Sequence, residues 1–341
     1  MTIKLFIKSG LLILFLTACA PKVYLAGPKV LEGQLLTNRY ITPDGEILPV
    51  RQWLPQQGKP AAIIIAVHGF NDYSHFFEQA GNFFRDQGIA CFAYDQRGFG
   101  GSMRRGVWSG TAAYVQDLDL FIQLVKAKNP GIPVYLLGES MGGAVVINAI
   151  NSTTPLTTKV NGIILSAPAV WDRASMPWYQ QALLWSLSHT VPWLTLTGRN
   201  LKIMASDNIP MLREMGKDPL VIKETRIEAV HGLADLMDAA AAKATAIDGR
   251  VLLIYGEKDQ IIPKQPTYQF IQQFLSTKAD KKTVALYENG YHMLLRDLQA
   301  VHYWQDIAAW IKTPSSPLPS GADKHAKQVL ISWSSALTGA C

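Results

Sequence analysis

An α/β fold built on a mostly parallel, doubly wound sheet is the fold class that the sequence predicts. Continuous apolar runs alternate along the chain with stretches of helical periodicity, which is typical of strands buried on both faces and joined by crossover helices. The 341 residues are 48% hydrophobic and 17% charged, which excludes a disordered chain and indicates a sizeable core. The predicted strands are Ala61–Val67, Ile89–Tyr94, Pro133–Leu137, Gly162–Leu165, Val251–Tyr255 and Thr283–Tyr287.

Turns and helices complete this pattern. Residues 35–54 contain Thr42-Pro43-Asp44-Gly45 between two apolar segments, which predicts a hairpin before the first buried strand. Residues 313–325 are rich in Pro, Ser and Gly, so the compact domain, residues 35–312, is expected to end near Lys312 and to be followed by a tail, residues 313–341, that either docks or frays. The predicted helices are Ser74–Gln87, Ala113–Lys128, Ser140–Asn151, Pro266–Leu275 and Gln299–Ile311.

The alternation is interrupted between about residues 168 and 247, where no convincing strand is found. We expect helices inserted between two strands, forming a lid over the carboxyl edge of the sheet. This segment is rich in tryptophan and methionine, which allows two interpretations: packing of the lid onto the domain, or an apolar pocket for an acyl chain. The residues concerned are Trp171, Trp178, Trp185, Trp193, Met176, Met204, Met211, Met215 and Met237.

The amino terminus has the layout of a secretory signal. Lys4 and Lys8 precede an apolar run, Leu11–Leu16, that is too short to span a membrane. The next residues, ending at Cys19, resemble a bacterial lipobox, which implies a signal peptide of residues 1–18, a lipidated Cys19 and a tether of residues 19–34; the alternative is an ordinary cleaved signal. By this resemblance, with Ala at position 20, we expect a lipid-anchored protein of the bacterial cell envelope, at the outer membrane and facing the periplasm.

Charge and cysteine content exclude other classes. The net charge is +6, but no basic run exceeds two residues, so no nucleic acid is expected as a partner. Cys91 lies in an apolar run and is expected to be a buried, inert thiol rather than the disulfide partner of Cys341. No His/Cys cluster has metal-ligand spacing, so neither metal nor cofactor is expected. The sequence does not indicate an oligomeric state.

A candidate nucleophile, Ser140, lies in the run Gly138–Gly143, which reads Gly-Glu-Ser-Met-Gly-Gly. The run follows a predicted buried strand and opens a predicted helix. The G-x-S-x-G pattern alone is weak, but a tight strand-to-helix turn requires small residues and exposes the serine above the sheet. A serine hydroxyl is a poor nucleophile until a base removes its proton, so a histidine and an orienting carboxylate are needed.

The acid and the base are expected at the carboxyl ends of strands, where parallel sheets bind ligands. Asp259 comes just after the predicted strand Val251–Tyr255, and His292 follows the next strand. Their order after the serine is that of serine hydrolases with a strand–turn–helix nucleophile. We predict a catalytic triad of Ser140, Asp259 and His292, with Glu257 as the rival acid.

An oxyanion intermediate needs hydrogen-bond donors, which this architecture takes from two backbone N–H groups. One belongs to the residue after the nucleophile, Met141. The other comes from the loop after an early strand, where the sequence reads His68-Gly69-Phe70, so Phe70 is the candidate. His68 itself is expected to hold this loop rather than to transfer a proton.

Residues 35–312 resemble the α/β-hydrolase fold, in the branch of monoacylglycerol lipases and bacterial lysophospholipases. The resemblance rests on five pieces in family order: residues 68–70, 95–102, 138–143, 256–259 and 290–292. Phe99 stands where the family often has His, and the tail after residue 312 has no counterpart. The resemblance implies a serine carboxylic-ester hydrolase that acts on a lipid ester. Thioesterase and serine aminopeptidase activities, and a non-catalytic lipid-binding role in the envelope, remain alternatives on this scaffold.

Overall fold

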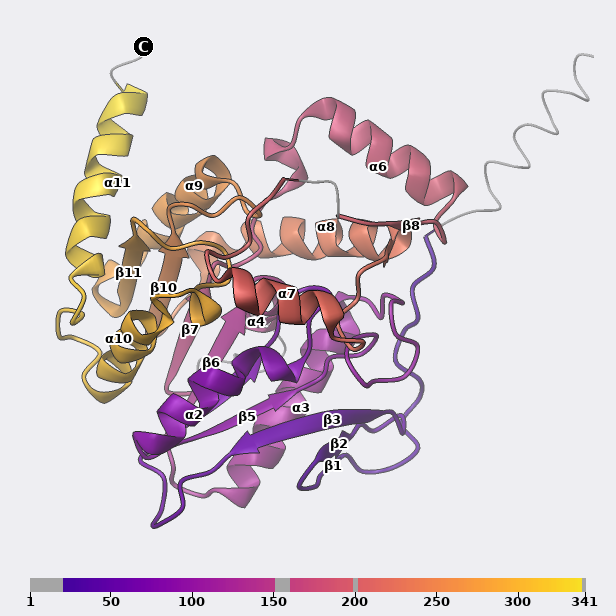
Figure 1. Ribbon diagram of the computed structural model, residues 1–341, viewed down its shortest axis with the longest axis horizontal. Helices are drawn as coiled ribbons and strands as arrows, with labels where there is room; N and C mark the ends of the chain where they lie inside the picture. Colours follow the sequence, from indigo (N-terminus) through magenta and orange to yellow (C-terminus); the bar gives the residue numbers. More distant parts are fainter. Residues whose placement is uncertain (1–20, 151–159, 199–201, 339–341) are drawn as a thin grey trace, which may run out of the picture.

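A nine-stranded sheet forms the centre of the computed structural model, which describes residues 21–150, 160–198 and 202–338 (Figure 1). The strand order is β1-β2-β3-β5-β4-β6-β7-β10-β11. The six strands from β5 to β11 in this order run parallel, and β1 to β3 are antiparallel. The predicted fold class is therefore confirmed. The strands are β1 (Gln34–Leu35), β2 (Arg39–Ile41), β3 (Ile47–Trp53), β4 (Ala62–Val67), β5 (Ile89–Tyr94), β6 (Val134–Glu139), β7 (Gly162–Ser166), β10 (Val251–Gly256) and β11 (Lys282–Tyr287).

Both faces of the sheet are covered, which explains why its strands are continuous apolar runs. Successive side chains of a strand point to opposite faces. In β4, Ile63 and Ile65 belong to one core, whereas Ala62 and Ile64 belong to the other. The first core is shared with α3 (Thr111–Lys128), α4 (Met141–Ile150) and α9 (Lys264–Leu275), and the second with α2 (Glu78–Asp86) and α10 (Ala300–Lys312).

The predicted hairpin is present as β2 and β3, which pair antiparallel with Ile41 opposite Ile47. Gly45 has a φ of +85° in the turn between them, a conformation that glycine adopts without a steric penalty. The hairpin therefore places the acidic residues Asp44 and Glu46 at the edge of the domain, where they meet Arg97.

In the described part of the segment between β7 and β10, which are neighbours in the sheet, the structure has three α-helices. They are α6 (Trp178–Thr190), α7 (Ile209–Lys217) and α8 (Ile227–Ala241). Helix α8 packs on α4, and α6 packs on the outer side of α8 (Figure 1). The lid also contains a ribbon that the sequence did not indicate, because its strands β8 (Thr195–Leu196) and β9 (Thr225–Arg226) are too short to show an alternation.

The lid tryptophans do not all pack inward. Trp178, Trp185 and Trp193 are 79%, 60% and 55% exposed. Packing onto the domain therefore does not explain these three side chains. Packing does explain Met237, which belongs to the core that contains Ile63 and Ile65, and Trp171, which packs against that core.

The compact part of the chain continues past the end predicted at Lys312. Helix α11 (Ala322–Thr338) packs beside the edge strand β11, with Ala326 fully buried. The ring of Trp333 meets that of Tyr268 edge-on, with 5.5 Å between centroids. The apolar piece after the Pro/Ser-rich linker therefore docks, and covers an edge that would otherwise be open to other strands.

The described part of the amino-terminal segment lies on the domain surface, where the N–H of Tyr24 donates to the carbonyl of Trp108 (2.9 Å). The signal peptide, Cys19 and Cys341 lie outside the described residues. Within the described part of the chain, no helix is both long enough and apolar enough to cross a bilayer. Cys91 is a buried free thiol, and burial raises its pKa well above the ordinary value.

Candidate active site

Ser140 lies in the sharp turn between β6 and α4. Its φ is +53°, a left-handed conformation that is strained for a residue with a side chain. The turn is possible only with small neighbours: a Cβ on Gly142 would lie 2.1 Å from the carbonyl oxygen of Val67. The Ser140 N–H donates to the carbonyl of Ser166 on β7 (3.0 Å), which fixes the turn above the sheet. The serine is half-buried and its loop faces the carboxyl edge of the sheet.

His292 and Asp259 are brought together from two neighbouring strand ends. The distance from His292 Nδ1 to Asp259 Oδ2 is 2.7 Å, and both side chains are buried. The other oxygen of Asp259 accepts from the N–H groups of Ile261 (2.7 Å) and Ile262 (3.0 Å). An ionised carboxylate only accepts hydrogen bonds, so the proton of the neutral imidazole is on Nδ1 and Nε2 carries the lone pair. This is the tautomer that a general base requires.

The charge of Asp259 also sets the basicity of His292. Burial acts to lower the pKa of the imidazole, but the charge and hydrogen bond of Asp259, helped by Glu139, outweigh burial and raise the pKa above 6.5. The imidazolium that forms when a proton is taken up is therefore stabilised in place.

Glu257, the rival acid, is engaged elsewhere. Its carboxylate accepts from Tyr268 (2.8 Å) and Lys264 (2.9 Å) and lies 2.7 Å from Nε2 of His325 in α11. Burial would raise its pKa, but these hydrogen bonds lower it to about 2. Glu257 therefore fastens the carboxyl-terminal helix to the loop that carries Asp259, and does not pair with His292.

The oxyanion loop, residues 68–72, passes beside the nucleophile. A Cβ on Gly69 would lie 3.3 Å from the Cβ of Ser140. Met141 is the first residue of α4, and first-turn N–H groups have no acceptor within their own helix. Phe70 is half-buried, and its ring packs against Phe99 with 5.7 Å between centroids. Both backbone donors proposed from the sequence thus flank the Ser140 turn.

His68 holds this loop through both ring nitrogens. Nε2 accepts from the N–H of Gln96 (2.9 Å), so Nδ1 carries the proton and donates to the carbonyl of Gly69 (2.8 Å). Burial lowers the pKa of His68, which keeps the ring neutral. Because neither nitrogen is free, His68 has the structural place expected from the sequence.

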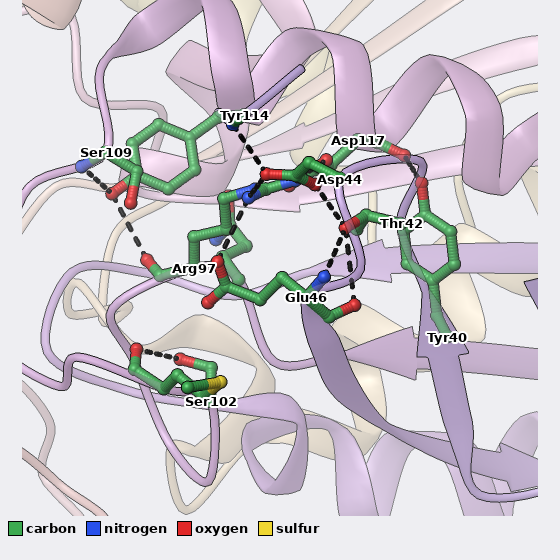
Figure 2. Close-up of polar contacts among 12 residues, drawn as sticks. Tyr40, Thr42, Asp44, Glu46, Arg97, Ser102, Ser109, Tyr114 and Asp117 are labelled. Atoms are coloured by element: carbon green, nitrogen blue, oxygen red, sulfur yellow. Dashed lines mark hydrogen bonds and ion pairs between the residues drawn. The ribbon is translucent and has the colours of Figure 1, made fainter. Parts of the chain in front are cut away.

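Arg97 has a structural place as well, at the turn of the hairpin (Figure 2). Its side chain is 4% exposed and bonds three carboxylates: Asp44 (2.7 Å), Glu46 (3.0 Å) and Asp117 of α3 (2.6 Å). These bonds join the hairpin to the sheet and to α3. They do not involve Ser140, Asp259 or His292.

One group at the site escaped sequence reasoning. The guanidinium of Arg296, four residues after His292, is buried and lies 2.9 Å from Glu139, the neighbour of the nucleophile. The only sequence signal is a charged residue in an otherwise apolar stretch, Met293–Leu295. Its partners lie 157 and 224 positions away, so spacing could not reveal them. Within the described residues, no cluster of His, Cys, Asp or Glu could hold a metal ion.

Comparison with known proteins identifies the class: this is an α/β-hydrolase fold. The solved structure of a soluble variant of monoglyceride lipase from Saccharomyces cerevisiae aligns with a TM-score of 0.67 at 19% identity, over 88% of this chain and all of the other. Residues 58–299 match the family described as serine aminopeptidase, S33, and the chain belongs to that family.

Curated relatives carry lipase names. The chain is 28% identical to the monoglyceride lipase of Mus musculus over 280 residues, which are 80% of this chain and 88% of the relative. It is 24% identical to the monoacylglycerol lipase of Mycolicibacterium smegmatis over 267 residues, covering 76% and 90% of the two chains. The predicted resemblance to this branch is confirmed.

Proposed function

We propose that this protein is a serine hydrolase that cleaves carboxylic esters through an acyl-enzyme on Ser140. The observation that carries the proposal is the 2.7 Å hydrogen bond between His292 and Asp259, at the same sheet edge as the strained Ser140 turn. A base in the correct tautomer, a carboxylate that orients it and a nucleophilic serine are the three parts that acyl transfer needs.

The reaction follows from these positions. His292 Nε2 takes the hydroxyl proton as Ser140 Oγ attacks the ester carbon. The resulting oxyanion is held by the N–H groups of Phe70 and Met141, each contributing about 3 kcal/mol to transition-state stabilisation. The carbon–oxygen bond to the alcohol then breaks as His292 returns the proton to the leaving oxygen. Water attacks the acyl carbon, gives its proton to His292, and releases the acid as Ser140 recovers its hydrogen.

The proposed substrate is a monoacylglycerol or a lysophospholipid. The support comes from the lipase names of the relatives and from the apolar lid above the site. The family description favours a second candidate, a serine aminopeptidase, which would cleave an amide next to a free amino group. The same triad chemistry serves both substrates.

A substrate panel tests this proposal. Fatty-acid release is measured from monoacylglycerols, lysophospholipids, short-chain esters and acyl thioesters, and amine release from aminoacyl anilides, with Ser140→Ala as the control. Release from the long-chain lipids, absent in the control, supports the proposal. Turnover confined to anilides would transfer the chain to the aminopeptidases, and turnover confined to thioesters would make it a thioesterase. Lipid binding without any turnover would indicate the non-catalytic role.

The second part of the proposal is a lipid anchor on Cys19 that holds the enzyme at the outer membrane, facing the periplasm. Its support is the layout of the first nineteen residues and the contact that Tyr24 makes with the domain. Tyr24 bonds Trp108, whose ring abuts Gly232 of α8: a Cβ there would lie 2.3 Å from the ring. The tether thus leaves the domain beside the lid.

The outer surface of the lid suits a bilayer. Residues 174–198 contain no Asp, Glu, Lys or Arg, although α6 within them is largely exposed. Trp178, Tyr179, Leu183 and Trp185 are each more than half exposed. Tryptophan and tyrosine prefer the interface between water and lipid, where an apolar ring meets a polar edge. We expect this surface to rest in the headgroup region, with the tether on the same side.

Two measurements test the anchor. Mass spectrometry of the protein made in a Gram-negative host should find a lipid-modified Cys19 in the membrane fraction, and Cys19→Ser should release the protein; an unmodified cysteine would contradict the anchor. In the Cys19→Ser background, co-sedimentation with phosphatidylglycerol vesicles should fall in W178S/W185S but not in L54S, which removes an exposed leucine that follows β3, away from the lid. Equal vesicle binding by both variants would refute the proposal that the exposed side of α6 contacts the bilayer.

A further inference from the structure

A buried guanidinium lies behind the loops of the proposed site. Arg296 ends a 3-10 turn, η5 (Leu294–Arg296), and is 7% exposed. Its Nη2 lies 2.7 Å from Asp72 Oδ2 and 2.9 Å from Glu139 Oε1. Its Nη1 lies 3.5 Å from the sulfur of Met215 in α7, so the same side chain also reaches the lid.

Each carboxylate partner belongs to a different part of the site. Glu139 is the last residue of β6 and directly precedes Ser140. Asp72 is the last residue of the oxyanion loop. Its N–H donates to the carbonyl of Gly69 (3.4 Å), which closes the loop as a turn. Arg296 itself follows His292 by four residues. One guanidinium therefore joins the nucleophile turn, the oxyanion loop and the histidine loop, which hydrogen bonds between strands do not join to one another.

The network formed by Arg296, Glu139 and Asp72 carries a charge that structural packing alone does not require. Two carboxylates against one guanidinium leave a formal excess of one negative charge. Within the described structure, Asp72 Oδ2, Glu139 Oε2 and Arg296 Nε are buried without a hydrogen-bond partner, so Asp72 meets Arg296 as an ion pair only. A buried ion pair that is not fully satisfied is weak evidence for stability, because an apolar replacement is often as stable. The reason for retaining this ion pair therefore lies in the function of the site.

That reason is the nearby imidazole. Three charged groups act on His292: Asp259, Glu139 and Arg296. Asp259 and Glu139 favour the protonated ring, whereas Arg296 opposes it. Burial outweighs the other effects and raises the pKa of Glu139, and the guanidinium of Arg296 limits this rise, so the negative charge of Glu139 depends on Arg296.

We propose that Arg296 is a positioning residue of the hydrolytic reaction: through Glu139 and Asp72 it aligns the three catalytic loops, and it keeps the negative charge of Glu139 beside His292. The inference rests on the proposed function, since it assigns Arg296 a part in the chemistry of Ser140. Arg296 touches no reacting atom; it acts through its two carboxylate partners.

Glu139→Gln tests the charge. The amide keeps the shape and an acceptor for Arg296 but removes the negative charge near His292. The acid limb of the pH profile of kcat on a soluble ester, p-nitrophenyl butyrate, should move to lower pH than in the wild-type enzyme. A limb that stays in place would overturn the charge part of the proposal, because a purely structural contact leaves the basicity of His292 unchanged.

Arg296→Lys tests the alignment. Both carboxylates meet the same nitrogen of Arg296, Nη2, while Nη1 reaches Met215. Lysine keeps the charge, but it is shorter and lacks the planar guanidinium that holds these contacts together. We expect kcat per active site to fall about 10–100-fold, since small misplacements of catalytic groups cost up to about 10²-fold. KM for the small ester and the acid limb should stay near the wild-type values. The double variant with Glu139→Gln should lose less than the product of the two single losses, because both changes weaken the same ion pair.

A matched control separates positioning from folding. Arg97→Lys changes an equally buried arginine with carboxylate partners away from the site, and should lower the melting temperature without changing kcat per active site. Active sites are counted by fluorophosphonate titration, so unfolded protein does not enter kcat. The proposal is overturned if Arg296→Lys behaves like Arg97→Lys, losing stability but not kcat. Ser140→Ala, run in parallel, tests the proposed function on its own, because every other variant keeps Ser140.

Discussion

Replacing Asp259 with asparagine probes the orientation of the base. In the structure one carboxylate oxygen accepts two backbone N–H groups, at 2.7 and 3.0 Å, and the other bonds His292 Nδ1 at 2.7 Å. An asparagine fits the two N–H groups only with its carbonyl oxygen, so its NH₂ group must face His292. The imidazole then accepts at Nδ1 and carries its proton on Nε2, where the Ser140 proton has to be received.

The expected loss is large. In serine hydrolases with this triad, the aspartate-to-asparagine exchange lowers kcat about 10⁴-fold, which corresponds to about 5.5 kcal/mol of transition-state stabilisation. The assay is kcat on p-nitrophenyl butyrate at a pH above the acid limb, with the melting temperature measured in parallel. Glu257→Gln is the matched control and should retain wild-type kcat, because Glu257 bonds Lys264, Tyr268 and His325 instead. Near-full activity of Asp259→Asn, or a collapse in Glu257→Gln, would refute the assignment of the acid.

Three further outcomes follow. The value of kcat/KM should rise with pH to a plateau, with a midpoint above pH 6.5, because the ring of His292 has a raised pKa and is a base only above it. A midpoint below pH 6.5, when kcat/KM is measured at a series of pH values, would contradict this. Gly142→Ala should cost about 2–5 kcal/mol of unfolding free energy in urea, since its methyl group would overlap the carbonyl of Val67, and an unchanged midpoint would refute the tight turn. Trp333→Ala should cost about 2 kcal/mol by undocking α11, and unchanged protection of α11 amides from hydrogen exchange would contradict that role.

The sheet was predictable because burial on both faces leaves a signature in the sequence. Ile89–Tyr94 coincides with β5, and the other buried runs match strands within about two residues. The order of Ser140, Asp259 and His292 was readable for a related reason, as each follows a strand and carboxyl ends share one edge. The hairpin was readable from its turn residues.

Other features depend on contacts that a sequence does not display. Docking of α11 rests on the match between its apolar stripe and the edge of the sheet, so the same residues could equally have formed a frayed tail. The exposure of Trp178 is set by where α6 lies, since composition cannot distinguish a buried aromatic from an exposed one. Arg296 has partners in three distant segments, and a buried ion pair has no periodicity.

The most direct test of the central claim is the covalent reaction at Ser140. The protein is incubated with a fluorophosphonate, and its intact mass and tryptic peptides are measured together with those of Ser140→Ala and His292→Ala. We expect one adduct per chain, located on the peptide that contains Ser140, absent from Ser140→Ala and greatly slowed in His292→Ala. A folded protein that gains no adduct, or gains one at another residue, would contradict a nucleophile at Ser140.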